Sequence, residues 1–565
     1  MSITSQANQA QTNQAQANPD LERPTLRVAL AQIKLTLGAV DANTQRVIAA
    51  VQANPTADLM VFPELTLTGC PLEDLVIRPD LSALLAESLE LISAQSHTTA
   101  ILVGYPEITG QTIYNAASVF YRGQRIAHYR KQRLANAAGF DEYRHFSAGT
   151  QSCVFDFKGH RIGVLLGQDI LAQAPLAAAK SAGAQLIVSA HADGYAEHIV
   201  TDRLQVLQQR VAETQLPIIW VNHIGGQDEL IFDGNSLVVD EMGRVALQLA
   251  HCQEDTQQLE IVGGKLPSEN RVPTTAKLDD IDAQTYQALV LALHDYVEKN
   301  GFEAVLLGLS GGIDSALTLA IAVDAIGAER IRAVMMPYQY TADISIEDAQ
   351  LQADWLGCAF DIVPIAPLVA GFMDLVPQLA TSTSQDTTEE NLQARCRGVL
   401  LMALSNKERR LLLTTSNKSE LAVGYCTLYG DMCGGFGPLK DVYKERVYAL
   451  ARYRNSLSMA IPERVITRPP SAELAPDQKD ADSLPAYPVL DAIIEGYAEH
   501  DKSIADLINA GYDELVVKRI VRLIELNEYK RRQGAIGPKV TRRNFGQSRR
   551  YPITSQYLNA MLEQV

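Results

Sequence analysis

Short apolar runs alternate with stretches of helical periodicity along most of this chain, and that alternation restricts its fold more than any other feature of the sequence. Runs such as LRVALAQI, DLMVF, IGVLL and IIWVN predict strands between about residues 25 and 262, with helices at 83–95 and 203–214. A second series follows a helix predicted at 283–299, with strands in AVLLGL, IRAVMM, AFDIV and LLLTT. Strands that alternate with helices of this length imply right-handed crossovers and parallel sheets. The pattern therefore predicts two α/β blocks.

Two polar segments divide the chain. Residues 1–24 are rich in Gln and Asn and too polar for a signal peptide, so we expect a disordered tail there. The segment GGKLPSENRVPTTAKLDD, residues 263–280, has little apolar content and is typical of a linker. Because 565 residues exceed what a single core supports, we expect separate domains at 25–262 and 281–565.

Charge and cysteine spacing exclude several classes of protein. The chain has 49 basic and 66 acidic residues, and its net charge of −17 repels nucleic-acid backbones and anionic membranes. No apolar run approaches the roughly 18 residues that span a bilayer. The seven cysteines show neither CxxC nor zinc-finger spacing, so we expect a reduced cytoplasmic protein without a disulfide or zinc framework. Any anionic ligand must therefore be held by a local cluster of donors.

The stretch VLLGLSGGIDSAL, residues 305–317, places a Gly-rich turn between a buried strand and an apolar helix. Its glycines let successive N–H groups converge on an anion, its serines add hydroxyl donors, and the helix start adds the positive end of a dipole. The turn is not the GxxxxGK[ST] loop of the common nucleoside triphosphatases. An aspartate inside an anion site would be repulsive alone, so we expect it to bind a Mg²⁺ that bridges the phosphates. The predicted nucleotide-binding residues are Gly308, Ser310, Gly311, Gly312, Asp314 and Ser315.

Further polar side chains follow the strand LLLTT at the carboxyl edge of the predicted sheet, where open α/β sheets bind ligands. Lys418 and Glu420 lie there, and Glu420 is a candidate second metal ligand. The stretch GPLKDVYKERV adds Lys440 and Lys444, and residues 527–533, NEYKRRQ, add three cations. Each of these charges alone is typical of a solvated face. Together they supply what an acidic protein needs to hold several phosphates.

Six motifs together resemble those of NAD synthetases, which belong to the N-type ATP pyrophosphatase superfamily. They are GLSGGIDSAL, MMPYQYTADISIEDA, TEENLQARCRG, TTSNKSELAVGYCTLYGDM, LKDVYKERVYALARYRN and EYKRRQ. This resemblance covers 281–565, and residues 25–262 resemble the nitrilase-like glutaminase domain of glutamine-dependent NAD synthetases. It implies an α/β chain with a nitrilase-like αββα sandwich followed by a Rossmann-like parallel-sheet ATP pyrophosphatase domain.

The resemblance also implies a two-step reaction on nicotinic acid adenine dinucleotide (deamido-NAD). Its carboxylate attacks the α-phosphorus of ATP to give an adenylate and pyrophosphate, and ammonia then displaces AMP to leave the amide of NAD. A carboxylate is a poor acyl donor because its leaving group would be oxide, so activation must precede amination. The expected partners are therefore the small molecules deamido-NAD, ATP and ammonia.

Individual residues carry the same resemblance. Mg²⁺ is implied on Asp314 and Glu420, and Lys444 is implied to contact phosphate oxygens. Thr415 matches an ATP contact of the family. Positions that match the surroundings of deamido-NAD are Asn391, Arg395, Glu420 and Lys530. Two departures are Ser416 and Tyr338, which stand where the family usually has glycine and serine.

Nitrilase-like amidases use a Glu–Lys–Cys triad, in which the carboxylate takes the thiol proton and the lysine stabilises the tetrahedral oxyanion. This chain supplies Glu64 and Lys131, but Gly167 stands where the family has the cysteine. Removing the nucleophile of a triad costs on the order of a million-fold in rate. The surroundings differ too, with His191 in place of a serine and LANA, residues 134–137, in place of LPNY. We therefore expect an inactive amidase domain and free ammonia as the nitrogen donor.

Three alternatives stay open at this point. A glutaminase could work through a nonstandard group, such as Cys70, Cys153 or His191, or through a partner subunit. The first domain could instead bind an amide ligand as a sensor. It could also bury apolar surface in a homo-oligomer, the assembly that we expect for this chain.

Overall fold

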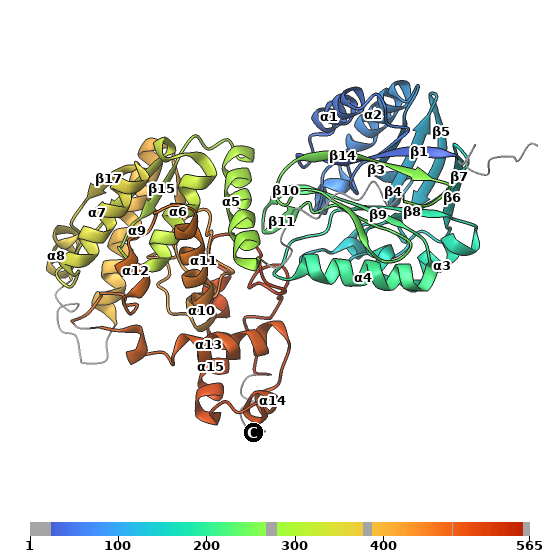
Figure 1. Cartoon of the computed structure of the whole chain (residues 1–565). Helices are drawn as coiled ribbons and strands as arrows, with labels where there is room; N and C mark the ends of the chain where they lie inside the picture. The colour runs from blue at the N-terminus through green and yellow to red at the C-terminus, as the bar shows by residue number, and fades with distance from the viewer. Residues whose placement is uncertain (1–23, 267–279, 377–386, 477, 558–565) are drawn as a thin grey trace, which may run out of the picture.

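The structure is a computed structural model that describes residues 24–266, 280–376, 387–476 and 478–557, in which two α/β units lie side by side (Figure 1). The predicted tail and most of the predicted linker lie outside the described residues. The elements of the first unit are the strands β1 (Thr25–Gln32), β2 (Leu59–Val61), β3 (Ala100–Thr109), β4 (Thr112–Tyr121), β5 (Gln124–Arg130), β6 (Cys153–Phe157), β7 (His160–Leu166), β8 (Leu186–His191), β9 (Ile218–Asn222), β10 (Ile224–Gln227), β11 (Leu230–Asp233), β12 (Leu237–Val239), β13 (Val245–Gln248) and β14 (Asp255–Val262), and the helices α1 (Val40–Ala53), α2 (Leu81–Gln95), α3 (Gln173–Ser181) and α4 (Ile199–Thr214).

Two six-stranded sheets form the centre of the first unit, in the orders β14-β1-β2-β3-β4-β5 and β13-β12-β9-β8-β7-β6. Helices α1 and α2 cover the outer face of the first sheet, and α3 and α4 cover the second (Figure 1). The predicted αββα sandwich is therefore confirmed.

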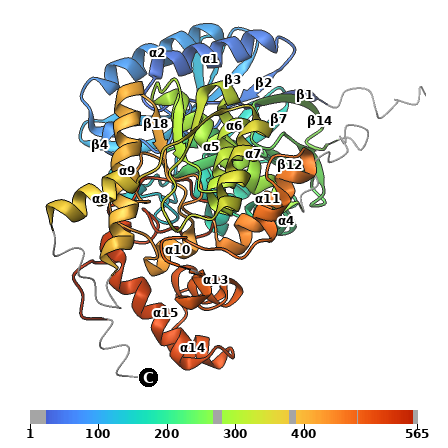
Figure 2. The same cartoon turned by 90° about the vertical axis from the view of Figure 1, so that its left-hand side faces the viewer.

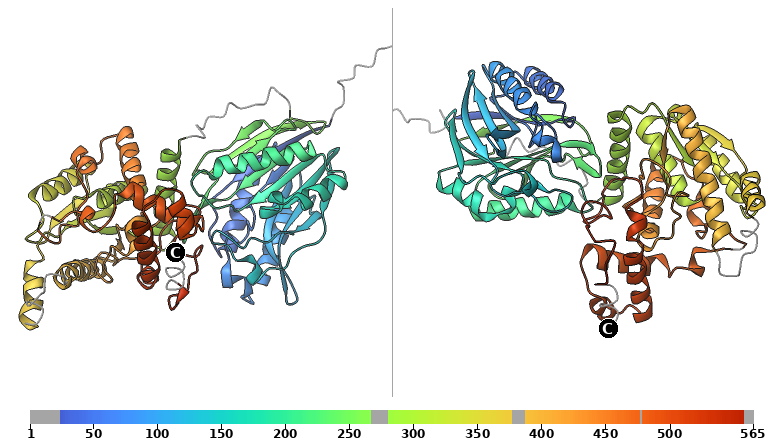
Figure 3. Two further views of the ribbon diagram at one scale, coloured as in Figure 1. Left: turned by 90° about the horizontal axis from the view of Figure 1, so that it is seen from below. Right: turned by 180° about the vertical axis from the view of Figure 1, so that it is seen from behind.

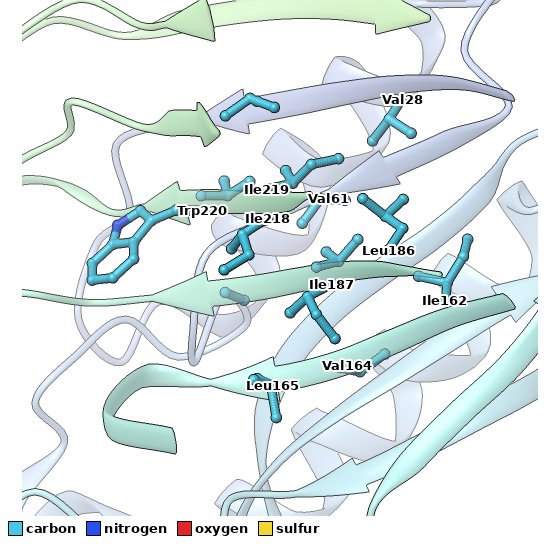
Figure 4. Packing of buried hydrophobic residues seen from close by; sticks show 14 of the residues in the cluster. Val28, Val61, Ile162, Val164, Leu165, Leu186, Ile187, Ile218, Ile219 and Trp220 are labelled. Atoms are coloured by element: carbon cyan, nitrogen blue, oxygen red, sulfur yellow. The ribbon is translucent and has the colours of Figure 1, made fainter. Parts of the chain in front are cut away.

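The period of two along each strand builds this sandwich. Val28 and Leu30 of β1 point into the core between the sheets, whereas Ala29 and Ala31 point toward α1 and α2. Figure 4 shows Val28 of the first sheet among β-branched side chains of the second. Both faces of β1 are thus buried, which explains why its sequence is a continuous apolar run.

The second unit is a parallel sheet wrapped by helices. Its strands pair in the order β17-β16-β15-β18, and every pairing is parallel, as the alternating pattern predicted. Helices α13, α14 and α15 form a separate cluster beside this sheet (Figure 2). The elements are α5 (Ile281–Lys299), β15 (Val305–Gly308), α6 (Ile313–Ile326), β16 (Ile331–Met335), α7 (Asp343–Leu356), β17 (Ala359–Ile362), α8 (Ala366–Leu375), α9 (Thr388–Glu408), β18 (Leu411–Leu413), α10 (Lys418–Val423), α11 (Lys444–Leu457), α12 (Glu463–Thr467), α13 (Tyr487–Ile494), α14 (Ile504–Asn509), α15 (Glu514–Leu526) and α16 (Glu528–Arg531).

Helix α5 lies between the two units (Figures 1 and 3). One apolar cluster contains Leu289 and Ala292 of α5 together with Ile224 and Ile231 of the hairpin β10–β11. The hairpin approaches so closely that a Cβ added at Gly226 would lie 3.0 Å from the Ala292 Cα. The two units therefore share a hydrophobic core across α5. None of the helices in the described ranges is long and apolar enough to cross a membrane.

A buried carboxylate fixes the same helix to the first unit. Asp295 accepts hydrogen bonds from Lys34 Nζ at 2.7 Å and from the Gly226 N–H at 2.9 Å. Burial alone would raise the pKa of Asp295, but His294, Lys34 and Lys299 outweigh it and lower that pKa to about 2. The carboxylate is therefore charged at neutral pH and joins both units.

The last described part of the chain returns to the first unit. The Lys539 N–H donates to the Glu229 carbonyl at 2.7 Å, and the Glu197 N–H donates to the Val540 carbonyl at 2.8 Å. The Glu229 carboxylate, which is buried, accepts from Asn544 Nδ2 at 3.0 Å. Residues 536–550 thus connect the second unit to the turn of the β10–β11 hairpin.

We expect Asp295→Ala to lower the free energy of unfolding by about 1.5 to 3 kcal/mol, because it removes the buried carboxylate that binds the half-buried Lys34 and the Gly226 N–H. Urea denaturation followed by far-UV circular dichroism measures this loss. Glu298→Ala is the matched control, since Glu298 lies on the same helix in an exposed ion pair with Arg330 and its loss should cost less than about 1 kcal/mol. Equal effects of the two substitutions would contradict the role of Asp295. Because the folded pKa is depressed, the contribution of Asp295 is complete above the unfolded pKa near 4 and is lost as the pH falls toward about 2.

Candidate functional site

The Gly-rich turn lies between β15 and α6, as predicted. Gly311 has φ +76°, and a Cβ added there would lie 2.2 Å from the Ser345 carbonyl oxygen, so only glycine fits. The Ser310 N–H donates to Ser315 Oγ at 3.1 Å, and the Gly312 N–H donates to Ser310 Oγ at 3.2 Å. The serines thus hold the turn at the start of α6, where the helix dipole favours an anion.

A cavity of about 550 Å³ opens beside this turn, at the carboxyl ends of β15, β16 and β18. Of the predicted residues, Gly311, Arg395, Lys418 and Lys440 are not part of its lining. Lys418 is instead buried in ion pairs with Asp441 and Glu499, which hold its amino group away from the cavity. Arg395 is exposed, and its Nε donates to the Leu428 carbonyl at 3.3 Å. The predicted residues that do line the cavity are Gly308, Ser310, Gly312, Asp314, Ser315, Asn391, Thr415, Glu420, Lys444 and Lys530.

Two carboxylates meet one lysine on the floor of the cavity. Lys444 forms ion pairs with Asp314 and, at 3.1 Å, with Glu420, and its side chain is buried. This adds to the expected contact with phosphate oxygens a pairing with two carboxylates that balance the charge of the amino group. Asn417 Nδ2 also donates to Asp314 at 2.8 Å. The sequence did not reveal this pairing, since the three residues come from different elements.

The donor set fits Mg²⁺. No group of three or more His, Cys, Asp or Glu side chains gathers in the described residues in the manner of an all-protein metal cage. Mg²⁺ in nucleotide sites uses one or two carboxylates and takes its other ligands from phosphates and water, so Asp314 and Glu420 suffice. Burial raises the pKa of Glu420 to about 8, with repulsion from Asp314 adding to it and attraction to Lys444 opposing it.

Two arginines that were not predicted from the sequence, Arg397 and Arg468, also line the cavity. Arg468 Nη2 donates to the Gly311 carbonyl at 3.0 Å, whereas its buried Nη1 has no hydrogen-bond partner among the described residues. Helical spacing could have identified Arg397, because Asn391, Ala394 and Arg397 are three residues apart and lie on one face of α9. Arg395 is not on that face. Arg468 follows α12 in an irregular segment, and no periodic signal identifies it.

The three predicted positions of the amidase centre also come together. Glu64 follows β2, Lys131 follows β5, and Gly167 follows β7. Lys131 Nζ lies 2.6 Å from Glu64 Oε1 and 2.8 Å from Glu142 Oε2, and both Glu64 and Lys131 are buried. Asn115 Nδ2 donates to Glu64 Oε1 at 2.7 Å. The acid and the lysine therefore persist as members of a closed ionic cluster.

A side chain at Gly167 would require Glu64 and Lys131 to shift. It has φ +46°, and a Cβ added there would lie 2.5 Å from Glu64 Oε2 and 2.7 Å from Lys131 Nζ. The two charged groups thus occupy the space that a side chain at this position would need. The candidate substitutes are poorly suited to replace it, because burial raises the pKa of both Cys70 and Cys153 and keeps the thiols protonated.

His191 is a packed side chain of the same region. Its ring stacks on Trp220 with centroids 3.5 Å apart, and its Nε2 lies 2.7 Å from Ser189 Oγ. Burial lowers the pKa of His191 well below its usual value, so the ring is neutral. These contacts assign His191 a packing role.

Two family models match separate parts of the chain. The NAD synthase family model matches residues 285–534, and the carbon-nitrogen hydrolase family model matches residues 27–266. The chain is 47% identical over 537 residues to a glutamine-dependent NAD(+) synthetase of Acinetobacter baylyi, covering 94% of this chain and 98% of that protein. The corresponding protein of Aquifex aeolicus is 37% identical over 565 residues, covering 94% of this chain and 100% of that protein.

Solved structures give the same result. The glutamine-dependent NAD+ synthetase of Acinetobacter baumannii, in complex with ADP, is 46% identical with a TM-score of 0.76, covering 94% of this chain and 98% of that one. A synthetase from Cytophaga hutchinsonii is 20% identical with a TM-score of 0.82, over 96% and 99% of the two chains, and shares the fold. From similarity along nearly its whole length, together with the Gly-rich turn and its cavity, the chain belongs to the family of NAD synthetases that carry a carbon–nitrogen hydrolase domain.

Proposed function

We propose that this NAD synthetase forms the amide of NAD from deamido-NAD, ATP and free ammonia. Similarity to NAD synthetases supports the ATP-dependent ligase reaction. The observation that favours ammonia is Gly167, which places hydrogen alone beside Glu64 and Lys131. Without a thiol or hydroxyl at that position, no acyl-enzyme can form there and no ammonia is released from glutamine.

The activation step is assigned to the cavity beside the Gly-rich turn. The N–H groups and hydroxyls of Ser310 and Ser315 would hold the departing pyrophosphate, and Arg468 would reach it with its unpartnered Nη1. Asp314 and Glu420 would hold a Mg²⁺, which neutralises charge on phosphate oxygens when bound. Asp314 and Glu420 would then pair less with Lys444, whose amino group would be available to phosphate oxygens, as the family resemblance implies.

The amination step needs less from the protein. Asn391 and Lys530 line the same cavity, where the family resemblance places deamido-NAD. Holding the activated carboxyl group there converts the attack of ammonia into a reaction between positioned partners. Only neutral ammonia has the lone pair that attacks the carbonyl carbon, so the rate at subsaturating total ammonia should rise as the pH rises.

A second candidate function is glutamine-dependent synthesis. The names of the relatives favour it, since the proteins of Acinetobacter baylyi and Aquifex aeolicus are glutamine-dependent NAD(+) synthetases. In this chain it would need a nonstandard nucleophile or a glutaminase supplied by a partner subunit.

The two functions differ in their nitrogen donor. With ammonium chloride as sole donor we expect steady NAD formation, and with glutamine we expect no NAD and no glutamate above a protein-free blank. Measuring NAD and glutamate in the same samples decides between them. Glutamate released in equal amount to NAD would establish the glutamine-dependent function instead.

We expect Gly167→Cys not to restore glutamine use, because Glu64 and Lys131 fill the space of the new side chain. We also expect it to lower stability by more than Gly110→Ala, the matched control, which has φ +61° but no atom within 4 Å of an added Cβ. The loss of stability in Gly110→Ala measures only the cost of placing a Cβ on a left-handed backbone, which is about 1 to 2 kcal/mol. Thermal denaturation and glutamate assays measure both effects, and a stable variant that releases glutamate would contradict the closed cluster.

For the synthetase site we expect Asp314→Asn to reduce kcat/KM for ATP by about 100-fold or more, because it removes charge that binds the cation and orients Lys444. Asp324→Asn is the control on the same helix, since Asp324 pairs with Arg454 and Tyr286 away from the cavity. It should lower the melting temperature while the rate of NAD formation stays the same. An Asp314→Asn enzyme of undiminished rate would remove Asp314 from the proposed site.

A further inference from the structure

A second, much smaller cavity lies behind the large one. Its volume is about 10 Å³, which is room for about one molecule the size of water or ammonia. Thr414 and Ser416 line both cavities, so these side chains form the wall between them. Neither hydroxyl has a hydrogen-bond partner in the described part of the chain. The small cavity therefore presents two free hydroxyls next to the space assigned to the activated carboxyl group.

Lys440 also lines the small cavity. Its side chain is only 12% exposed, and no acceptor among the described residues lies within hydrogen-bonding distance of Nζ. The nearest ionic partner is Glu229 Oε1 at 3.9 Å. An amino group in this position has few contacts that favour its charged form.

The charged groups around Lys440 come from three segments. Glu229 belongs to the turn of the β10–β11 hairpin, and Asp441 is the next residue in the chain, held by Lys418 at 2.8 Å. Arg531 of α16 lines the same cavity but is paired with Glu528. Burial lowers the pKa of Lys440, and the attraction to Glu229 and Asp441 opposes that effect without reversing it.

We propose that Lys440 takes a proton from an ammonium ion in the small cavity and so delivers neutral ammonia to the activated carboxyl group. This inference rests on the proposed use of free ammonia. One N–H bond of ammonium breaks and leaves its electron pair on nitrogen, while the lone pair of the Lys440 amine forms the new N–H bond. Ammonia then attacks the carbonyl carbon and AMP departs. The nitrogen loses one more proton to water, and Glu229 stabilises the protonated Lys440 until it returns its proton to solvent.

The pH profile of kcat/KM for total ammonia tests the proposal, at saturating ATP and deamido-NAD. In the wild type it should rise with pH and level off below the pKa of ammonium, because Lys440 accepts the proton. In Lys440→Met it should keep rising until that pKa, because only ammonia that is already neutral can react. At pH 8 we expect a loss of about 100-fold. At a pH above the pKa of ammonium the two enzymes should differ by less than about threefold.

Two further variants separate proton transfer from packing and charge. Lys440→Arg keeps the positive charge but cannot give up its proton at these pH values, so it should lose as much activity as Lys440→Met. Lys539→Met is the matched control. Lys539 is buried, its amino group has no hydrogen-bond or ionic partner among the described residues, and burial lowers its pKa, but it does not line the cavity. It should keep the wild-type profile.

Three results would overturn the proposal. They are a wild-type rate in Lys440→Arg, an unchanged profile in Lys440→Met, and a loss that is equal at every pH. If Lys440→Met has a lower melting temperature than the wild type, its rate also reflects lost stability, and the test then depends on the rate of Lys440→Arg. If the wild type makes no NAD from ammonium, both the proposed function and this inference fail. If it does and the Lys440 variants match it, only this inference fails.

Discussion

The burial of helix α5 between the two units is the constraint on which the rest of the molecule depends. Its apolar face shares a core with the β10–β11 hairpin, and Asp295 binds Lys34 and the hairpin backbone of the other unit. A second unit on its own would expose this apolar face to water, and Asp295 would lose its bonds to Lys34 and to the Gly226 N–H. The first unit can therefore be retained for stability when its own reaction has been lost.

If the amidase reaction is lost, as proposed, the same reasoning explains why Glu64 and Lys131 are present beside Gly167. A nucleophilic side chain that pairs with no other group can be absent at little cost in stability. Glu64 and Lys131 are buried together with Glu142, and removing one of them would leave the others uncompensated, at a cost of about 3 to 5 kcal/mol. The charged pair thus persists for packing reasons, and its presence is weak evidence for catalysis.

Most of the fold and part of the site could be predicted from the sequence. Helix α5 was predicted at 283–299 and is observed at Ile281–Lys299, because a long run of good helix formers there is interrupted by neither Gly nor Pro. The Gly-rich turn could also be predicted, because the residues that form it are consecutive in the sequence. Arg468 and the pairing of Lys444 with Asp314 could not, because they depend on segments more than a hundred residues apart. Local pattern identifies a turn or helix, whereas the partners of a charged side chain are decided by tertiary contacts.

The net charge of the chain affects which form of the nitrogen donor gathers near the protein. A net charge of −17 repels ATP and deamido-NAD but attracts ammonium, so the field of the protein concentrates the form of the nitrogen donor that cannot react. An enzyme that depends on a dissolved donor in this field needs a place where the proton is removed close to the acyl group. A desolvated amine beside two hydroxyls supplies such a place, because burial disfavours charge on the lysine and makes it a proton acceptor. In the proposed scheme the net negative charge and the desolvated Lys440 act in sequence, the first attracting ammonium and the second converting it to the nucleophile.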